Sequence, residues 1–177
     1  MNSIIENLIT RRSIRKFKKE IPSDEVLEEI CKAGSYAPSG MNSQECKIVL
    51  IKNKNIISEL SKLNAKYLWS THPEHADPFY GAPVIAIVFA DTTIKTYLQD
   101  GSLVMGNLMN AAHALNVGSC WIHRAKEMFE DEIGKAYLKQ WGLDEKLEGI
   151  GVCILGYSDM VLPAPPPRKE NFIITVN

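Results

Sequence analysis

Apolar residues recur at helical spacing in several stretches of the chain. Between these stretches lie shorter runs of consecutive apolar residues. The helical stretches are residues 2–12, 24–34, 55–63, 93–115 and 127–140. The second predicted helix begins after Ser23, a typical N-cap residue, and ends at Gly34, a typical stop. Gly101 and Gly106 lie within the longest predicted helix, where small residues permit close packing against a partner helix.

The continuous apolar runs predict strands at residues 46–52, 83–90, 118–122 and 149–156. The 83–90 run has no polar residue, which is typical of a strand buried on both faces. Before this strand, residues 64–81 are predicted to be irregular and mobile. All of these elements fit in one chain of 177 residues, which predicts a single domain, residues 1–177, with its own hydrophobic core.

The C-terminal arm, residues 163–177, has a different character. Four of the nine prolines fall between Pro163 and Pro167, so this part is extended and cannot join a helix. Residues 172–176 are apolar and strand-like. A strand that follows a stiff arm suits exchange with a partner subunit, while a local edge strand is the alternative that the sequence leaves open.

Composition and charge narrow the classes of function. The formal net charge is −1, so no overall positive field favours nucleic acid, and phosphate-binding charge must be local. The longest apolar stretch, residues 82–90, is shorter than the roughly 20 residues of a membrane-spanning helix, and residues 1–10 lack a signal-peptide pattern. We therefore expect a cytoplasmic protein without membrane or nucleic-acid partners. The four cysteines form no CxxC pair, which argues against a metal site or a disulfide framework.

The first candidate for chemistry is a basic segment made of Arg11, Arg12, Ser13 and Arg15, at the end of the first predicted helix. Guanidinium groups present paired donors to phosphate oxygens, and a hydroxyl adds another donor. The segment therefore indicates a local phosphate site. A basic turn that only complements the C-terminal dipole of the helix is the alternative.

The second candidate is an almost uncharged loop, residues 37–44, which contains Pro38, Ser39 and Asn42. Its side-chain amides and hydroxyls both donate and accept hydrogen bonds, as the uracil-like edge of a flavin ring requires. An ordinary turn before a strand is the alternative interpretation of this loop.

Two further pairs are candidates. His123 and Arg124 follow the strand predicted at 118–122, where backbone N–H groups can face a ligand, and His123 is either an acid-base group or a structural residue. Arg168 and Lys169 follow the prolines of the arm. They either add positive charge to a phosphate site or only keep the tail in water.

Taken in order, these segments resemble the nitroreductase family of FMN enzymes. The RRSIR segment, the PSGMNSQ loop, the GSCWI strand after a long helix and the Arg-Lys pair after the prolines match its pattern over nearly the whole chain. The resemblance implies an α+β fold in which helices flank a mixed, mostly antiparallel sheet. It also implies an intertwined homodimer with FMN at its interface.

The resemblance further implies which residues contact FMN. They are spread along the chain: Arg11, Arg12, Ser13, Arg15, Pro38, Ser39, Asn42, His123, Arg124, Arg168 and Lys169. In this set the first arginines and the C-terminal pair bind phosphate, Arg15 lies by the N1/O2 edge of the ring, and the 37–44 loop reaches the flavin of the partner subunit. The backbone at residues 123–124 faces flavin N5, and His-Arg stands there where the family often has Glu-Gly.

The implied activity is that of an oxidoreductase that takes a hydride from NAD(P)H and reduces nitroaromatics, quinones or similar electron-poor acceptors by a ping-pong mechanism. Flavin N5 carries the chemistry, so no protein residue is expected to be catalytic. Reductive dehalogenation or flavin breakdown on the same cofactor, and non-catalytic flavin binding, are the alternatives. A nucleic-acid binder that uses residues 11–19 is disfavoured, because the chain is net acidic and no aromatic platform accompanies them.

Overall fold

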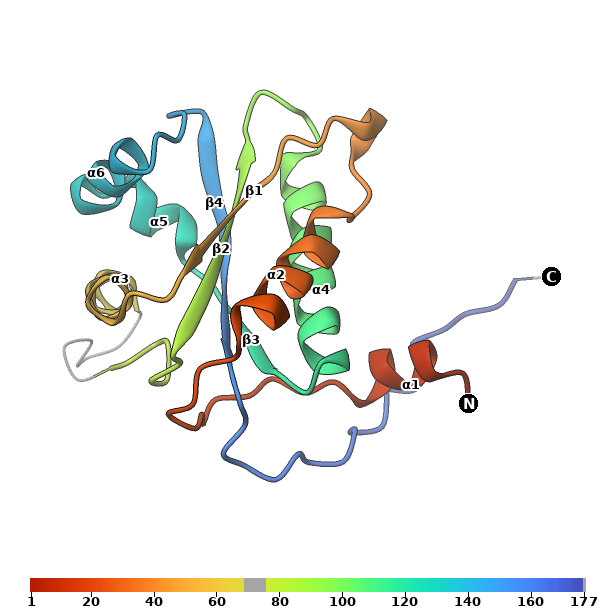
Figure 1. The fold of residues 1–177 in the computed structure, drawn as a ribbon. Helices are drawn as coiled ribbons and strands as arrows, with labels where there is room; N and C mark the ends of the chain where they lie inside the picture. The colour runs from red at the N-terminus through yellow and green to blue at the C-terminus, as the bar shows by residue number, and fades with distance from the viewer. Residues whose placement is uncertain (69–75, 177) are drawn as a thin grey trace.

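The computed structural model describes residues 1–68 and 76–176 of the chain. Its helices are α1 (Ser3–Thr10), α2 (Asp24–Ser35), α3 (Lys54–Lys66), α4 (Tyr97–Ala114), α5 (Ala125–Glu130) and α6 (Glu132–Gln140), with a short 3-10 turn, η1 (Gly40–Asn42). Its strands are β1 (Lys47–Ile51), β2 (Val84–Asp91), β3 (Gly118–Ile122) and β4 (Leu147–Gly156). Figure 1 shows the strands at the centre, the helices on either side and a C-terminal arm that leaves this body.

The strands form one antiparallel sheet in the order β1-β2-β4-β3. β2 and β4 pair at its centre, where Ile87 lies opposite Val152. Successive side chains of a strand point to opposite faces, so a strand with only apolar residues needs a cover on both faces. β2 is buried from Val84 to Ala90, which confirms the strand that was predicted to be buried on both faces.

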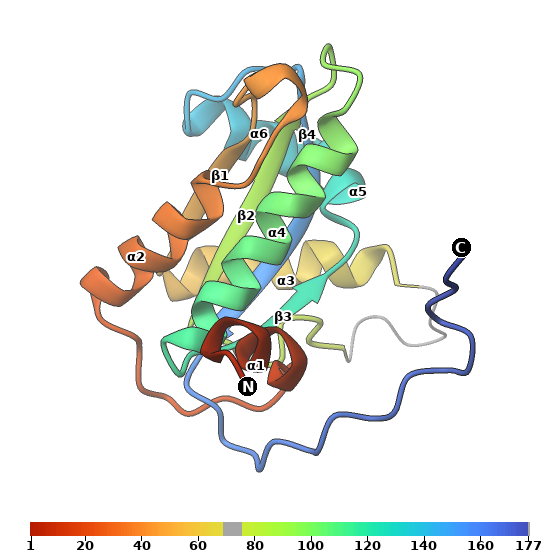
Figure 2. The same cartoon turned by 90° about the vertical axis from the view of Figure 1, so that its right-hand side faces the viewer.

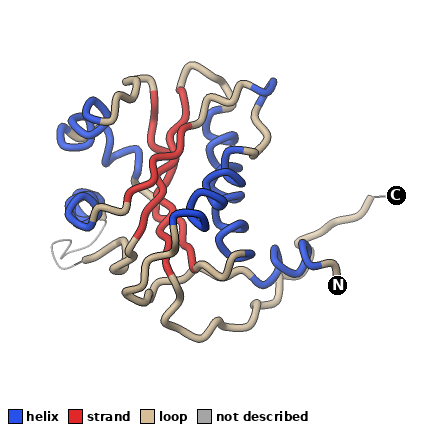
Figure 3. The backbone as a smooth tube through the Cα atoms, viewed as in Figure 1, coloured by secondary structure: helices blue, strands red, loops and turns tan. Residues whose placement is uncertain are grey.

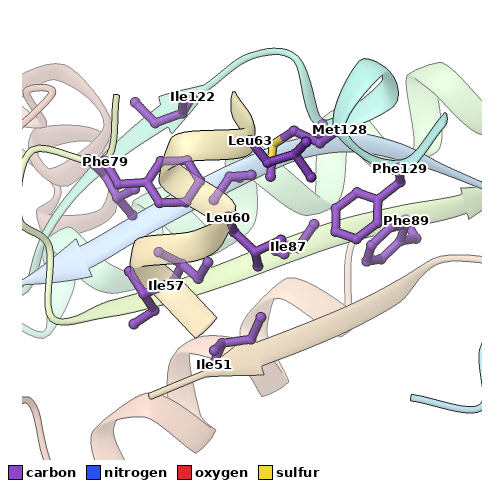
Figure 4. Packing of buried hydrophobic residues seen from close by; sticks show 14 of the residues in the cluster. Ile51, Ile57, Leu60, Leu63, Phe79, Ile87, Phe89, Ile122, Met128 and Phe129 are labelled. Carbon is purple, nitrogen blue, oxygen red and sulfur yellow. The ribbon is translucent and has the colours of Figure 1, made fainter. Parts of the chain in front are cut away.

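Helices provide this cover on each face, with α2 and α4 on one side and α3, α5 and α6 on the other (Figures 1 and 3). On the α3 side, Phe89 and Phe129 meet edge to face with ring centroids 4.7 Å apart, and Figure 4 shows the surrounding apolar side chains. On the α4 side, Met105 and Leu108 are fully buried. Each such side chain contributes about 1.5–3 kcal/mol to stability. The expected α+β fold, with helices flanking a mostly antiparallel sheet, is confirmed, and the four described strands are all antiparallel rather than mixed.

The helix predicted over residues 127–140 is wrong in one respect, because two helices occupy this stretch. Asp131 has an extended backbone (ψ 150°) that ends α5, and its side chain accepts a hydrogen bond from the N–H of Ile133 at the start of α6. An aspartate that caps the next helix is favoured over one that continues the previous helix. The apolar period continues across the break, and the sequence pattern therefore concealed it.

Two other expectations need correction. The 64–81 stretch is not irregular at its start, because α3 continues to Lys66, and residues 69–75 within it lie outside the described part of the chain. Gly101 does not face a partner helix, since an added Cβ would lie 2.6 Å from Ile150 of its own sheet. Gly106 differs, because no described atom lies within 4 Å of its added Cβ.

The C-terminal arm extends away from the body of the domain, as both views show (Figures 1 and 2). Residues 159–176 are exposed, and the structure has no strand at residues 172–176, so the local edge strand is wrong. Phe172 and Ile173 are 72% and 85% exposed. Among the described helices, none has the length and apolar character needed to cross a membrane.

Candidate active site

The basic segment is held against the sheet by its backbone. The N–H of Ile14 donates to the carbonyl of Ser119 in β3 at 2.9 Å, and Ser13 forms a parallel bridge to the same residue. Ile14 is 2% exposed, so its side chain anchors the segment in the core. Gly118 permits this close approach, because an added Cβ would lie 2.9 Å from Cγ1 of Ile14 and 3.0 Å from a backbone oxygen. The arginines on either side of Ile14 are thus attached to a fixed backbone.

Arg12 is turned back onto the helix that precedes it. Its Nη2 donates to the carbonyl of Ile9 at 3.0 Å and its Nη1 to the carbonyl of Arg11, so it satisfies two carbonyls at the C-terminus of α1. The alternative of a helix-capping basic turn therefore describes part of what Arg12 does. It does not account for Nε of Arg12, which is buried and has no hydrogen-bond partner among the described residues.

Further polar groups on this segment and on β3 also lack partners. Nη1 of Arg11, Oγ of Ser119 and Nε1 of Trp121 are buried without a hydrogen bond to any described residue. A buried donor without a partner costs about 1–3 kcal/mol, so such a cluster indicates a ligand that supplies acceptors. Burial first, and then the positive charges of Arg11 and Arg12, lower the pKa of the nearby His113. The free donors of Arg11 and Arg12 and the Ser119 hydroxyl fit the anionic phosphate of a flavin nucleotide, whereas Nε1 of Trp121 lies against Gly151 of β4.

A cavity of about 400 Å³ lies at the end of β3, next to this segment. Arg15 reaches it from the basic segment, with its guanidinium carbon 6.0 Å from the centroid of the Tyr80 ring. Trp121 and His123 line it from the strand end, with ring centroids 5.8 Å apart. The cavity therefore has a cation at its edge and flat aromatic walls, as a planar heterocycle requires.

Arg124, which also lines the cavity, has its backbone in the left-handed region at φ 75°. Its Nε and Nη2 donate to Oδ1 of Asn64 at 3.1 and 3.0 Å. The amide nitrogen of Asn64 donates in turn to the carbonyl of His123 at 2.8 Å. Asn64 is fully buried, and sequence analysis missed it because it lay in a stretch predicted to be irregular. A polar residue among the apolar positions of a helix is the signal that would have found it.

The 37–44 loop is built around another residue that sequence analysis missed, Asp100 of α4. The N–H of Gly40 donates to both carboxylate oxygens of Asp100 at 3.1 Å, and the Thr96 hydroxyl donates to it at 2.6 Å. The Thr96 hydroxyl first, and then the Gly40 N–H, hold the pKa of Asp100 below its usual value, against the effect of burial. Met41 and Asn42 have positive φ, at 53° and 57°, so the loop is held in an uncommon backbone conformation.

Pro38, Ser39 and Asn42 of this loop line a groove of about 940 Å³ between α2, β1 and α4. The loop is attached to the N-terminal half of α4, whereas α1 and the basic segment are attached to its C-terminal end, where Thr10 bonds to His113 (Figure 2). Asp100 and His113 are thirteen residues apart, which corresponds to about 20 Å of helix. The two candidate segments therefore do not share a cleft within one protomer.

The C-terminal pair also lies apart from the basic segment. Arg168 and Lys169 are both exposed on the arm, and Nη2 of Arg168 donates to the carbonyl of Pro166 within the arm itself. One protomer thus brings together Arg11, Arg12 and Ser13 with a cavity that contains Arg15, His123 and Arg124. It leaves the loop and the arm elsewhere.

A sequence model of the nitroreductase family matches residues 8–157, which is most of the chain. The chain belongs to the nitroreductase family. The matched range includes the basic segment, the 37–44 loop and the strand end at residues 123–124. The resemblance that the sequence motifs indicated is therefore confirmed for the family.

Comparisons with individual proteins agree with this family assignment. An Archaeoglobus fulgidus protein whose name includes NAD(P)H nitroreductase is 27% identical over 162 residues, 89% of this chain and 86% of the relative. One from Methanothermobacter thermautotrophicus with the same words in its name is 28% identical over 123 residues, and the chain spans only 59% of its length. The crystal structure of a nitroreductase with bound FMN from Bacteroides fragilis matches all of both chains with a TM-score of 0.91 at 26% identity.

Proposed function

We propose that this protein is an FMN-dependent oxidoreductase that takes a hydride from NAD(P)H and reduces electron-poor acceptors such as nitroaromatics and quinones. The observation that carries the proposal is that Arg11 and Arg12 each have a buried donor with no partner among the described residues. These donors lie beside the cavity at Arg15. The Bacteroides fragilis relative with bound FMN and the names of the archaeal relatives support the choice of cofactor and electron donor.

The phosphate would be held by residues whose backbone is already fixed. Arg11 and Arg12 would each supply a free donor, and the hydroxyls of Ser13 and Ser119 lie on the paired backbone beside them. Hydrogen bonds between guanidinium groups and phosphate are charge-assisted and about twice as strong as neutral ones. Binding would satisfy groups that are otherwise buried without partners.

FMN, when bound, supplies the redox chemistry by accepting a hydride from the nicotinamide and passing the electrons to the acceptor. The protein's own contribution is to bind the cofactor and to adjust its reactivity. Arg15 at the edge of the cavity would stabilise negative charge on the reduced ring, and the backbone of His123 and Arg124 would border the reacting end. The walls formed by Tyr80 and Trp121 would orient a flat acceptor and exclude water. No side chain needs to act as an acid or base in this scheme.

We further propose that the functional unit is a homodimer. The basic segment and the 37–44 loop are attached about 20 Å apart along α4, so both can contact one flavin only if they come from different subunits. A two-fold axis that places two α4 helices antiparallel brings the N-terminal end of one beside the C-terminal end of the other. Pro38, Ser39 and Asn42 would then serve the flavin of the partner. The outer face of α4, with Gly106 and a 47% exposed Leu103, suits this contact.

The C-terminal arm, residues 163–177, would be exchanged in this dimer. Its apolar end is exposed, and β1 pairs only with β2 among the described strands, so an edge of β1 is free. Apolar residues on an extended segment gain backbone partners and burial by joining such an edge. Arg168 and Lys169 would be carried across with the arm, towards the phosphate site.

The proposal is tested by the absorption spectrum of the purified protein and by rapid mixing with nicotinamide nucleotides. We expect the purified protein to bind FMN, to show the absorption of oxidised flavin, and to be bleached under anaerobic conditions by NADH or NADPH. Reoxidation by a nitroaromatic or a quinone, compared with a halogenated phenol, separates reductase from dehalogenase activity. A protein that rejects added FMN would refute the cofactor, and one that binds FMN but is never bleached would be a passive flavin carrier.

A further inference from the structure

A second groove lies directly behind the wall of the cavity at Arg15. It has a volume of about 690 Å³, within the usual range of small-molecule sites, and runs between α3, residues 17–21 and the turn at residues 76–83. Ala76 and Asp77 line both the groove and the cavity. Neighbouring residues of the turn serve the two spaces, because Phe79 lines the groove and Tyr80 the cavity.

The groove is strongly cationic. The lysines that line it come from three separate parts of the chain: Lys18, Lys19, Lys52, Lys54 and Lys62. Only Lys52 forms an ion pair with a described residue, with Asp24 at 2.7 Å. Lys16, just outside the groove, is different, since it pairs with Asp159 at 3.1 Å. A groove lined by charges of one sign has a positive potential that attracts an anionic ligand.

One acid lines the groove, and its oxygens are already in use. Asp77 accepts hydrogen bonds from the Ser61 hydroxyl at 2.6 Å and from the N–H groups of Phe79 and Gly81 at 3.1 and 2.6 Å. These bonds shape the turn that separates the groove from the cavity. Asp77 and Asp24 together offset two of the five positive charges, so the groove keeps a net positive charge for a ligand.

The floor of the groove is apolar. Ile21 lines it and is 51% exposed, Phe17 and Pro83 are half-buried, and Ile57 and Phe79 are buried. An inorganic anion alone would leave the exposed side chain of Ile21 in contact with water. The combination of an apolar floor with a cationic rim fits a ligand that joins a flat ring system to phosphate groups.

We propose that this groove binds the adenosine 2′-phosphate end of NADPH, and that it selects NADPH over NADH. The inference rests on the proposed use of NAD(P)H. The cavity at Arg15 holds about 400 Å³ and would already contain the flavin ring with the nicotinamide stacked on it, so it has no room for the rest of a dinucleotide. The adenosine end must therefore lie outside it, and the lysine groove shares its wall. A 2′-phosphate adds a dianion that the lysines can pair with, and NADH lacks this group.

The test compares a double variant, Lys18→Ala with Lys62→Ala, with a control of equal charge, Lys95→Ala with Lys139→Ala. All four lysines are exposed, so the fold should tolerate both changes, and circular dichroism checks this. Binding of adenosine 2′,5′-bisphosphate and of 5′-AMP is measured by calorimetry on the FMN-loaded protein. We expect the groove variant to bind the bisphosphate about tenfold more weakly and the control to be unchanged.

Rapid mixing supplies the second measurement. The NADPH concentration that half-saturates flavin bleaching should rise about tenfold in the groove variant, and the value for NADH should stay the same. Equal losses in the groove variant and the control, or a groove variant that keeps its preference for NADPH, would overturn the inference and leave the proposed function standing. If neither nucleotide bleaches the unaltered protein, the proposed function itself fails.

Discussion

Asn64 in α3 and Arg124 at the end of β3 are joined by two hydrogen bonds, from Nε and Nη2 of the arginine to one amide oxygen, at 3.1 and 3.0 Å. The same amide donates to the carbonyl of His123 at 2.8 Å. A single buried side chain thus fixes the backbone of His123 and the side chain of Arg124. It holds the left-handed conformation of Arg124 at the point where the resemblance places flavin N5.

Asn64→Ala should destabilise the protein. The change leaves the carbonyl of His123 and the guanidinium of Arg124 without their buried partner and opens a small cavity. We expect the free energy of unfolding to fall by about 2–4 kcal/mol, measured by urea denaturation. A double-mutant cycle with Arg124→Ala isolates the pair, with an expected coupling of about 0.5–3 kcal/mol. Strict additivity of the two changes would show that the hydrogen bonds contribute nothing to stability.

Arg11→Ala should weaken the retention of FMN, because Nη1 of Arg11 is buried without a partner among the described residues and would pair with phosphate. We expect the dissociation constant of FMN to rise on the order of tenfold. Lys16→Ala is the matched control, since Lys16 is exposed and pairs with Asp159 at the surface. Unchanged flavin occupancy after extensive dialysis of the Arg11 variant would remove its phosphate role.

Gly118→Ala should disturb the same site from the opposite side. The new Cβ would lie 2.9 Å from Cγ1 of Ile14 and push the basic segment away from β3. We expect a loss of about 1–3 kcal/mol in the free energy of unfolding together with weaker FMN binding. Thermal unfolding with and without FMN measures both effects. Full FMN affinity in a destabilised variant would mean that the position of the segment does not matter for the cofactor.

Gly106→Trp tests the dimer. No described atom lies within 4 Å of a Cβ added at Gly106, so an alanine there should be tolerated by one protomer and raise helix stability by about 1 kcal/mol. A tryptophan should block packing of one α4 against another, yield monomers in analytical ultracentrifugation and release FMN on dilution. A tryptophan variant that sediments as a dimer with bound FMN would place the interface elsewhere.

The ionisation of Asp131 should contribute to the pH dependence of stability. Hydrogen bonds from the Lys66 ammonium, then the Tyr67 hydroxyl and the N–H of Ile133, lower the pKa of Asp131 to about 2 from an ordinary 3.8. A lowered pKa in the folded state stabilises the protein above the unfolded pKa, and this contribution is lost as the pH falls through the folded pKa. Asp131→Asn keeps a capping oxygen but removes the charge. The stability difference between the two proteins should therefore shrink between about pH 4 and pH 2, and a constant difference in urea denaturation would contradict this.

Local patterns predicted the separate elements well, because each depends on residues close in sequence. Ser23 caps α2 as expected, with its hydroxyl accepting from the N–H of Val26 at 3.4 Å. The unbroken apolar run became the central strand β2. The break at Asp131 was missed because the apolar periodicity is the same on both sides of it. The continuation of α3 to Lys66 was missed because polar residues conceal the end of that helix.

The candidate site shows a similar division. Its basic segment and strand end were recognisable as residue types suited to phosphate and to a flavin. The buried residues that hold them were not, since Asn64 is 60 residues from Arg124 and Asp100 is 60 residues from Gly40. A hydrogen bond between residues so far apart leaves no periodic trace in either segment.

By itself the sequence determined where most helices and strands form, because backbone preference and apolar period act over a few residues. It also showed which segments hold residue types suited to binding phosphate and flavin. Only the tertiary structure decided that the basic segment and the 37–44 loop lie at opposite ends of α4, and that lysines from three parts of the chain line one groove. These relations arise from how the elements pack around the sheet, and packing joins residues that are distant along the chain.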